Sequence, residues 1–140
     1  MIVFFDLQLS HDIFAIALRS EQFFIIKRFT ASSDSFLSGL EKILKESKCG
    51  LGDIKKIVLV SAGDETFSNS RMGVMYANML AALLGIYVAK FSRTHDNVTR
   101  EEEYTSMLLE SDLSLLHFSR TLEPHYSSKP HITKSAKKVL

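Results

Sequence analysis

Three strand-like runs with short connections fill the start of the chain, and this arrangement limits the fold more than any other feature. The runs cover residues 2–7, 13–19 and 22–29, and only Ser20 and Glu21 separate the second from the third. Short apolar runs rich in β-branched and aromatic residues are typical of strands, and short connections join antiparallel neighbours. The sequence therefore predicts an antiparallel β-meander at the N-terminus.

The hydrophobic period becomes helical after residue 30. Apolar residues recur at helical spacing from Phe36 to Leu44, including Leu37, behind the capping candidates Ser32, Ser33 and Asp34. This amphipathic helix should end near Cys49 and Gly50, because glycine can take the left-handed conformation of a helix C-cap. The remaining pattern predicts a strand at 56–60, a helix at 68–84 closed by Gly85, and a strand at 86–91.

The resulting order, β-β-β-α-β-α-β, is the signature of one lobe of the ribonuclease-H-like fold, which also builds actin, Hsp70 and the sugar kinases. The last two strands need crossover helices, so we expect a mixed five-stranded α/β sheet with parallel pairing in its second half. We assign residues 1–92 to this lobe and residues 93–140 to a short C-terminal extension. Within the extension, residues 99–111 predict a short helix with acids in its first turn, and residues 112–119 predict a strand or turn.

Composition limits the function classes. The formal net charge of +1 argues against nucleic-acid binding by bulk charge, although four lysines of the extended tail (Lys129, Lys134, Lys137 and Lys138) could contact RNA phosphates or form a solvated terminus. The lone Cys49 forms no internal disulfide and favours a reducing, cytoplasmic setting. The N-terminus lacks the pattern of a signal peptide, and the longest apolar stretch, 79–89, is about half a membrane span. We therefore expect no membrane partner.

A two-metal nuclease is one catalytic hypothesis, because this fold often holds two divalent ions between carboxylates. Asp6, Glu41 and Asp64 occur at about the required places: the first strand, a helix and the end of the fourth strand. The alternative is structural, with Asp6 as a polar strand residue, Glu41 as a solvated helix position and Asp64 as a helix-entry acid. A kinase-like site is disfavoured because the loop after the first strand, "DLQLSHD", contains no glycine. No histidine pair has metal-ligand spacing on a helix, so we expect no metal and no cofactor.

The stretch "GDETFSNSRMG", residues 63–73, resembles a motif of the TsaB (YeaZ) family. That family has Gly-Pro-Gly-Ser-Phe-Thr-Gly, a hydrophobic residue and then Arg-hydrophobic-Gly between its fourth strand and second helix. Gly63, Phe67, Arg71 and Gly73 match in register, whereas Asp64, Glu65 and Asn69 replace Pro, Gly and Gly. The following "MLAALLGIYV" is similar to the end of the family's helix, and the resemblance covers about residues 1–92.

The resemblance implies a non-catalytic accessory subunit of a threonylcarbamoyltransferase complex, which modifies an adenosine beside the tRNA anticodon. Its partner would be a TsaD-like catalytic subunit, with a homodimer when the chain is alone. A TsaE-like ATPase and tRNA would be indirect partners through the complex. The C-terminal residues 93–140 would then be a reduced remnant of a second lobe with a basic extended tail.

The helix at 68–84 is apolar on nearly every side, so more than one of its faces needs a covering. At 100° per residue, one side carries Gly73, Ala77, Leu80 and Leu84, and a neighbouring side carries Met72, Met75, Tyr76, Met79 and Leu83. One side can pack on the sheet while the methionine-bearing side meets a partner, because methionine repacks at low cost. The alternative is that both sides belong to the core.

Overall fold

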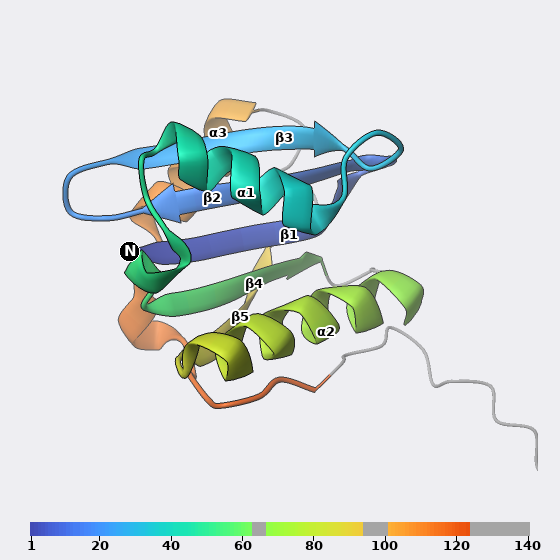
Figure 1. The fold of residues 1–140 in the computed structure, drawn as a ribbon. Coiled ribbons are helices and arrows are strands. Elements are labelled where there is room, and N and C mark those ends of the chain that lie inside the picture. The colour runs from blue at the N-terminus through green and yellow to red at the C-terminus, as the bar shows by residue number, and fades with distance from the viewer. Residues whose placement is uncertain (63–66, 94–100, 124–140) are drawn as a thin grey trace, which may run out of the picture.

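A five-stranded mixed sheet lies at the centre of the computed structural model, which describes residues 1–62, 67–93 and 101–123 (Figure 1). Its strands follow the order β3-β2-β1-β4-β5, with β1 antiparallel to β2, β2 antiparallel to β3, and parallel pairing of β1 with β4 and of β4 with β5. The strand bounds are β1 Ile2–Ser10, β2 Ile13–Arg19, β3 Phe24–Thr30, β4 Lys56–Ala62 and β5 Tyr87–Arg93. The predicted meander and the predicted mixed sheet are both confirmed.

The first helix, α1, spans Phe36–Glu46 and begins with a capping box. Ser35 accepts a hydrogen bond from the Ser38 backbone N–H, and the Ser38 hydroxyl oxygen accepts one from the Ser35 N–H, each at 3.1 Å. The predicted caps Ser32, Ser33 and Asp34 are therefore wrong, because the reciprocal serine pair fixes the start one residue later. A short 3-10 turn, η1 (Leu51–Asp53), leads from α1 toward β4.

The end of α1 also differs from the prediction at Gly50. Lys48 takes the left-handed conformation, with a φ of 57°, whereas Gly50 has a φ of −114°. The Lys48 and Cys49 N–H groups donate to the carbonyls of Lys45 and Leu44, so the helix closes before glycine is reached. The predicted conformation of Gly50 is therefore wrong.

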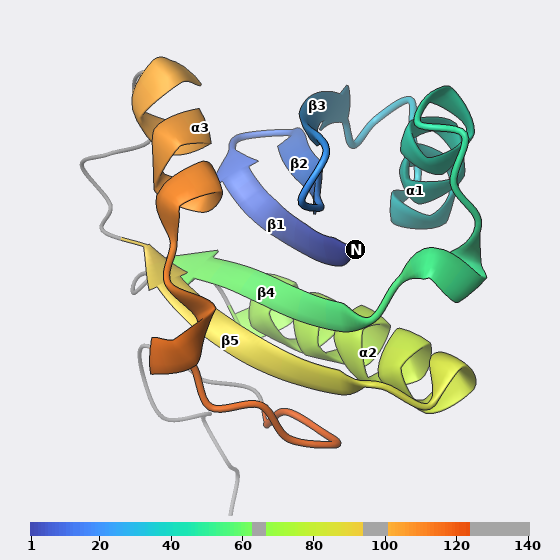
Figure 2. The ribbon, with the colours of Figure 1, turned by 90° about the vertical axis from the view of Figure 1, so that its left-hand side faces the viewer.

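One face of the sheet is covered by α1 and by the second helix, α2 (Phe67–Leu84), as Figure 2 shows. Alternate residues of β1 and β2, such as Val3, Phe5 and Ile16, point to this face and pack with Ile43 of α1 and Ala77 of α2. The predicted C-cap of α2 is confirmed, because Gly85 has a φ of +66°.

The opposite face is covered by α3 (Glu101–Glu110), which confirms the predicted acid-led helix (Figure 2). Tyr104 and Leu108 are fully buried against Phe4, Val58 and their neighbours. A 3-10 turn follows, η3 (Leu113–Leu115), and Ser119 forms an isolated antiparallel bridge with Val88 of β5. Within the described residues, no helix combines the length and the apolar character that crossing a bilayer requires.

Candidate interaction surface

Helix α2 packs on the sheet through its small residues. Gly73, Val74, Ala77, Leu80 and Ala81 are buried, at the spacing of one helix face. At Gly73 the helix approaches β4 closely, since a Cβ there would lie 3.0 Å from Cδ1 of Leu59. Gly73, the last glycine of the motif, therefore allows the close contact between α2 and β4.

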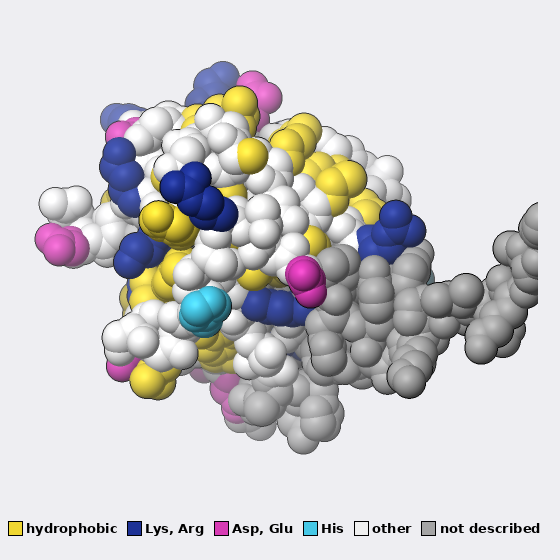
Figure 3. All heavy atoms as spheres, turned by 90° about the horizontal axis from the view of Figure 1, so that it is seen from below, with side chains coloured by type: hydrophobic (Ala, Val, Ile, Leu, Met, Phe, Trp, Pro, Cys, Tyr) yellow, Lys and Arg dark blue, Asp and Glu magenta, His cyan; other side chains and the backbone are white. Residues whose placement is uncertain are grey.

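The neighbouring face of α2 lies open to solvent. Met75 is 55% exposed and Leu83 is 69% exposed, and Met72 and Met79 are exposed as well. We call Met72, Met75, Met79 and Leu83 the methionine face. In Figure 3, hydrophobic side chains gather on the side of the molecule where α2 lies. Contiguous exposed apolar patches are uncommon on monomeric proteins and often mark interaction sites.

The methionine face continues into a groove between α2 and α1. The groove has a volume of about 720 Å³, and Met79, Leu80 and Leu83 line it from α2. Its other wall carries Leu37, Leu40, Glu41, Leu44, Lys45, Cys49 and Leu51. A concave apolar surface bordered by one acid and one lysine is suited to the side chains of another helix.

Leu37 and Leu51 are members of this surface that the sequence alone does not identify. The helical spacing places Leu37 beside Phe36 on the apolar face of α1, yet the structure leaves Leu37 exposed at the groove. Tyr76, in contrast, is less exposed than a member of the methionine-bearing side was expected to be. Its side chain is half-buried, and its ring lies 4.6 Å from the ring of Phe36, so Tyr76 joins α2 to α1 at the edge of the methionine face.

The residues of the family motif are only partly described. Gly63 lies outside the described residues, and Phe67 begins α2 although its side chain is not described. Arg71 is exposed on the first turns of α2, and Gly73 faces the sheet. The structure therefore gives a physical role to Gly73 within the motif.

Asp6 lies in the middle of β1 and is buried beneath α3. Its Oδ2 accepts a hydrogen bond from Nε of Arg93 at 2.6 Å and another from the hydroxyl of Tyr104 at 2.9 Å. The side chains of Asp6 and Arg93 are both almost fully buried, so the two charges compensate each other away from water. Burial, followed by the negative charge of Asp6, raises the pKa of the Tyr104 hydroxyl. Tyr104 therefore stays protonated as a donor.

The acids of the nuclease hypothesis are not brought together. Asp6 faces α3, whereas Glu41 is exposed on α1 at the opposite face of the sheet, and Asp64 lies outside the described residues. Across residues 1–62, 67–93 and 101–123, no group of three His, Cys, Asp or Glu side chains could hold a metal ion. The grouping of Asp6 with Glu41 that the nuclease hypothesis requires does not form, because alternation along β1 points Asp6 away from the helix that carries Glu41.

Arg93 and Tyr104 are the two partners of Asp6 that sequence reasoning missed. They lie 87 and 98 positions after Asp6, on β5 and α3. The available signal was Asp6 itself, because an acid inside an apolar strand requires a partner when the strand is buried on both faces.

The fold is similar to that of two solved structures, both from Pseudomonas aeruginosa. The first is YeaZ, with a TM-score of 0.55 and 17% sequence identity over 66% of this chain and 44% of YeaZ. The second is an uncharacterized protein with similarity to peptidase YeaZ, with a TM-score of 0.53 and 14% identity over 66% of this chain and 42% of the other. No protein-family model matches the chain, and no curated protein matches it either.

This chain spans less than half of the length of either structure. At these identities the similarity establishes the fold alone. Over the aligned 66% of its length, the chain has the mixed α/β, ribonuclease-H-like fold of the matched part of YeaZ.

Proposed function

We propose that this chain is a TsaB (YeaZ)-like accessory subunit that binds a TsaD-like catalytic subunit through the methionine face. In this role it supports transfer of a threonylcarbamoyl group to the adenosine beside the tRNA anticodon and supplies no catalytic residue itself. The observation that carries the proposal is the exposed methionine face, which borders a groove of about 720 Å³ between α1 and α2. The YeaZ-like fold and the motif around Gly73 support the choice of family.

The chemistry of the surface suits a helical partner. Leu37 of α1 and Met79 and Leu83 of α2 stand on two adjacent helices, so a partner helix can lie between them and bury all three. The thioether chains of Met72, Met75 and Met79 can repack around such a partner at low cost. Without that partner, the same surface would pair with a second copy of this chain. A TsaE-like ATPase and tRNA would join through the complex.

The environment of Asp6 is consistent with a subunit that is not a nuclease. The carboxylate is buried and engaged by Arg93 and Tyr104, so binding a metal ion there would require a buried ion pair to break. Addition of Mg²⁺ and a labelled RNA to the purified chain should therefore give no cleavage.

The decisive experiment is co-purification with the TsaD of the same genome, followed by size-exclusion chromatography at micromolar concentration. The wild-type chain should elute with TsaD, and the Met75→Asp/Met79→Asp variant should elute alone while keeping its circular dichroism spectrum and melting temperature. Leu115→Asp is the matched control, because Leu115 is 82% exposed on η3 and lies outside the groove. It should bind TsaD normally.

Failure of the wild-type chain to bind TsaD would refute the choice of partner. Loss of folding in the double variant would instead show that the methionine face belongs to the core. Self-association of the isolated wild-type chain should also be lost in Met75→Asp/Met79→Asp and kept in Leu115→Asp.

A further inference from the structure

A row of residues crosses the whole sheet at one end, on the face that α3 covers only in part. The strand registers pair Phe24 with Arg19, Arg19 with Ile2, Ile2 with Lys56, and Lys56 with Tyr87. Residues paired in this way have side chains on the same face of the sheet. The row therefore places two cations and two aromatic rings side by side across five strands.

The segment after η3 adds one more cation and one more aromatic ring beside these strands. Ser119 and Val88 exchange two backbone hydrogen bonds, of 2.8 and 2.9 Å, which fix this segment beside β5. Nζ of Lys56 lies 5.0 Å from the centre of the Phe118 ring, and the guanidinium of Arg120 lies 6.0 Å from that of Tyr87. Each cation thus lies near the face of an aromatic ring. We call Arg19, Lys56, Arg120, Tyr87 and Phe118 the cationic row.

The cations of the cationic row have no ion-pair partner among the described residues, although Glu21 lines the pocket that contains Arg19. Among residues 1–62, 67–93 and 101–123, Arg19, Lys56 and Arg120 form no salt bridge with a carboxylate. Lys56 and Arg120 are exposed, and the Tyr87 ring is 50% exposed. Two exposed cations, the half-buried Arg19 and an accessible ring therefore lie together on a chain whose net charge is only +1.

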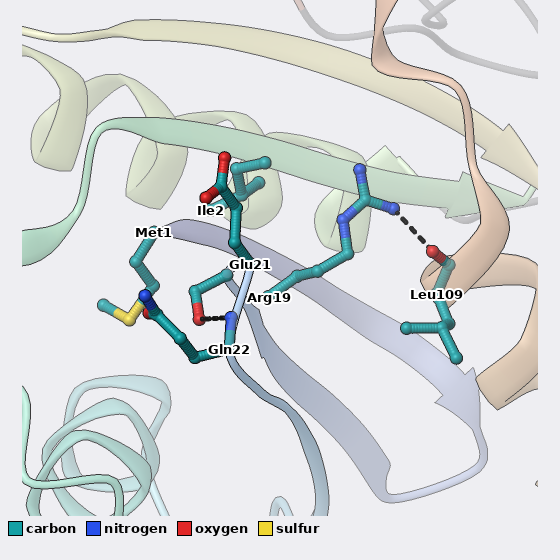
Figure 4. Close-up of a pocket in the computed structure, with 7 residues that line it drawn as sticks. Met1, Ile2, Arg19, Glu21, Gln22 and Leu109 are labelled. Atoms are coloured by element: carbon teal, nitrogen blue, oxygen red, sulfur yellow. Dashed lines mark hydrogen bonds between the residues drawn. The ribbon is translucent and has the colours of Figure 1, made fainter.

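Arg19 anchors one end of the cationic row. Its Nη1 donates to the carbonyls of Leu108, Leu109 and Ser111 at 2.7, 3.0 and 3.1 Å, so this nitrogen holds the C-terminal end of α3. Beside it lies a pocket of about 610 Å³ formed by Met1, Ile2, Arg19, Ser20, Glu21, Gln22 and Leu109. Figure 4 shows the Arg19 side chain extending away from Glu21 toward Leu109, which keeps the guanidinium at the pocket.

We propose that the cationic row binds single-stranded RNA, with phosphates on Lys56, Arg120 and Arg19 and a base stacked on Tyr87. Neighbouring strands are about 4.8 Å apart, so Arg19 on β2 and Tyr87 on β5 are separated by roughly 14 Å, a length suited to an extended strand rather than one small anion. Aromatic rings interleaved with cations on a sheet are the usual means of binding unpaired bases. The proposal goes beyond the accessory role, because the cationic row and the methionine face lie on opposite faces of the sheet.

The test measures fluorescence anisotropy of a labelled 15-nucleotide single-stranded RNA over a series of salt concentrations. Each phosphate contact on a single strand contributes about −0.7 to the slope of log affinity against log salt. The Lys56→Gln/Arg120→Gln variant should therefore bind more weakly, with a slope less steep by about 1.4. The matched control, Lys42→Gln/Lys45→Gln, removes two lysines from α1 on the other face and should bind as the wild type does.

Tyr87 and Glu21 give two further readouts. Tyr87→Ala should weaken binding by roughly 5- to 150-fold at an unchanged salt slope, and Tyr87→Phe should restore it, because stacking needs the ring and not the hydroxyl. Glu21→Gln should tighten binding, because it removes an acid that lines the same pocket as Arg19. All five variants should keep the wild-type circular dichroism spectrum.

An unchanged salt slope in Lys56→Gln/Arg120→Gln would overturn the proposal, whatever the total affinity. Poly-glutamate is the competing probe. If it displaces RNA equally well and Tyr87→Ala has no effect, the surface attracts acidic chains in general and the proposal is wrong. Neither result bears on TsaD binding, which is measured without RNA.

Discussion

Removal of one hydroxyl group tests the network beneath α3. In Tyr104→Phe the ring still fills its buried site, but the 2.9 Å hydrogen bond to Asp6 is lost. Hydrogen bonds to charged groups contribute about 1.5–3 kcal/mol. Since Arg93 still pairs with Asp6, we expect the free energy of unfolding at pH 7 to fall by about 2 kcal/mol.

The difference in free energy of unfolding between the wild type and Tyr104→Phe should become smaller as the pH rises. Burial raises the pKa of Tyr104, so the folded chain keeps the phenolic proton at a pH where the unfolded chain, with a tyrosine pKa of about 10, has lost it. The unfolded state then binds fewer protons, and stability falls by about 1.4 kcal/mol per pH unit above pH 10. At pH 11 the advantage of the wild type over Tyr104→Phe should shrink from about 2 to about 0.6 kcal/mol.

Urea unfolding followed by far-ultraviolet circular dichroism, at several values between pH 7 and pH 11, measures both effects. Other groups that titrate in this range are common to the two proteins and cancel in the difference. A difference that stays constant from pH 7 to pH 11 would refute the assignment of the network. A loss below about 0.5 kcal/mol at pH 7, the usual range for surface changes, would show that the hydroxyl contributes no net stability.

Three further sets of variants test separate parts of the fold by urea or thermal unfolding. Arg93→Met should lower the free energy of unfolding by about 3–5 kcal/mol, because it leaves the buried Asp6 carboxylate without its ion-pair partner. Asp6→Leu/Arg93→Met should cost less than the sum of the two single changes, and strict additivity would contradict the pairing. Gly85→Ala should lower the free energy of unfolding by about 1 kcal/mol, because the φ of +66° at Gly85 is unfavourable for residues with a side chain. No loss would show that the helix end changes conformation and that the left-handed cap is not required. Leu80→Ala should cost about 2–5 kcal/mol, whereas Leu83→Ala on the exposed side should change stability by less than about 0.5 kcal/mol; equal losses would place both residues in the core.

The element order was predictable because most elements have a local sequence pattern that indicates their type. The apolar runs at residues 13–19 and 56–60 have the length and composition of strands, and Gly85 marks the end of α2 in the way that left-handed glycine usually does. The start and end of α1 were not predictable with the same accuracy. Ser35 competes with three other capping residues immediately before it, and the left-handed residue is Lys48 rather than the nearby glycine.

The sequence predicts which side of α2 is exposed, but not how far the exposed surface extends beyond α2. Helical geometry separates Met75 and Leu83 from Ala77 and Leu80, and the structure leaves the first pair exposed and buries the second. The groove beyond α2 depends on how α1 packs beside it, so the role of Leu37 could not be read from the period of either helix. The partners of Asp6 were hidden for the same reason, since contacts 87 and 98 residues apart leave no local pattern.

The pairing of Asp6 with Arg93 and Tyr104 has a consequence for biosynthesis. The first strand leaves the ribosome long before β5 and α3 exist, so the growing chain carries its central carboxylate and the apolar face around Phe4 and Val58 without their cover. Sheet contacts between distant segments also form slowly. Until α3 has left the ribosome this apolar face stays uncovered, and a chain released between β5 and α3 would expose it to aggregation.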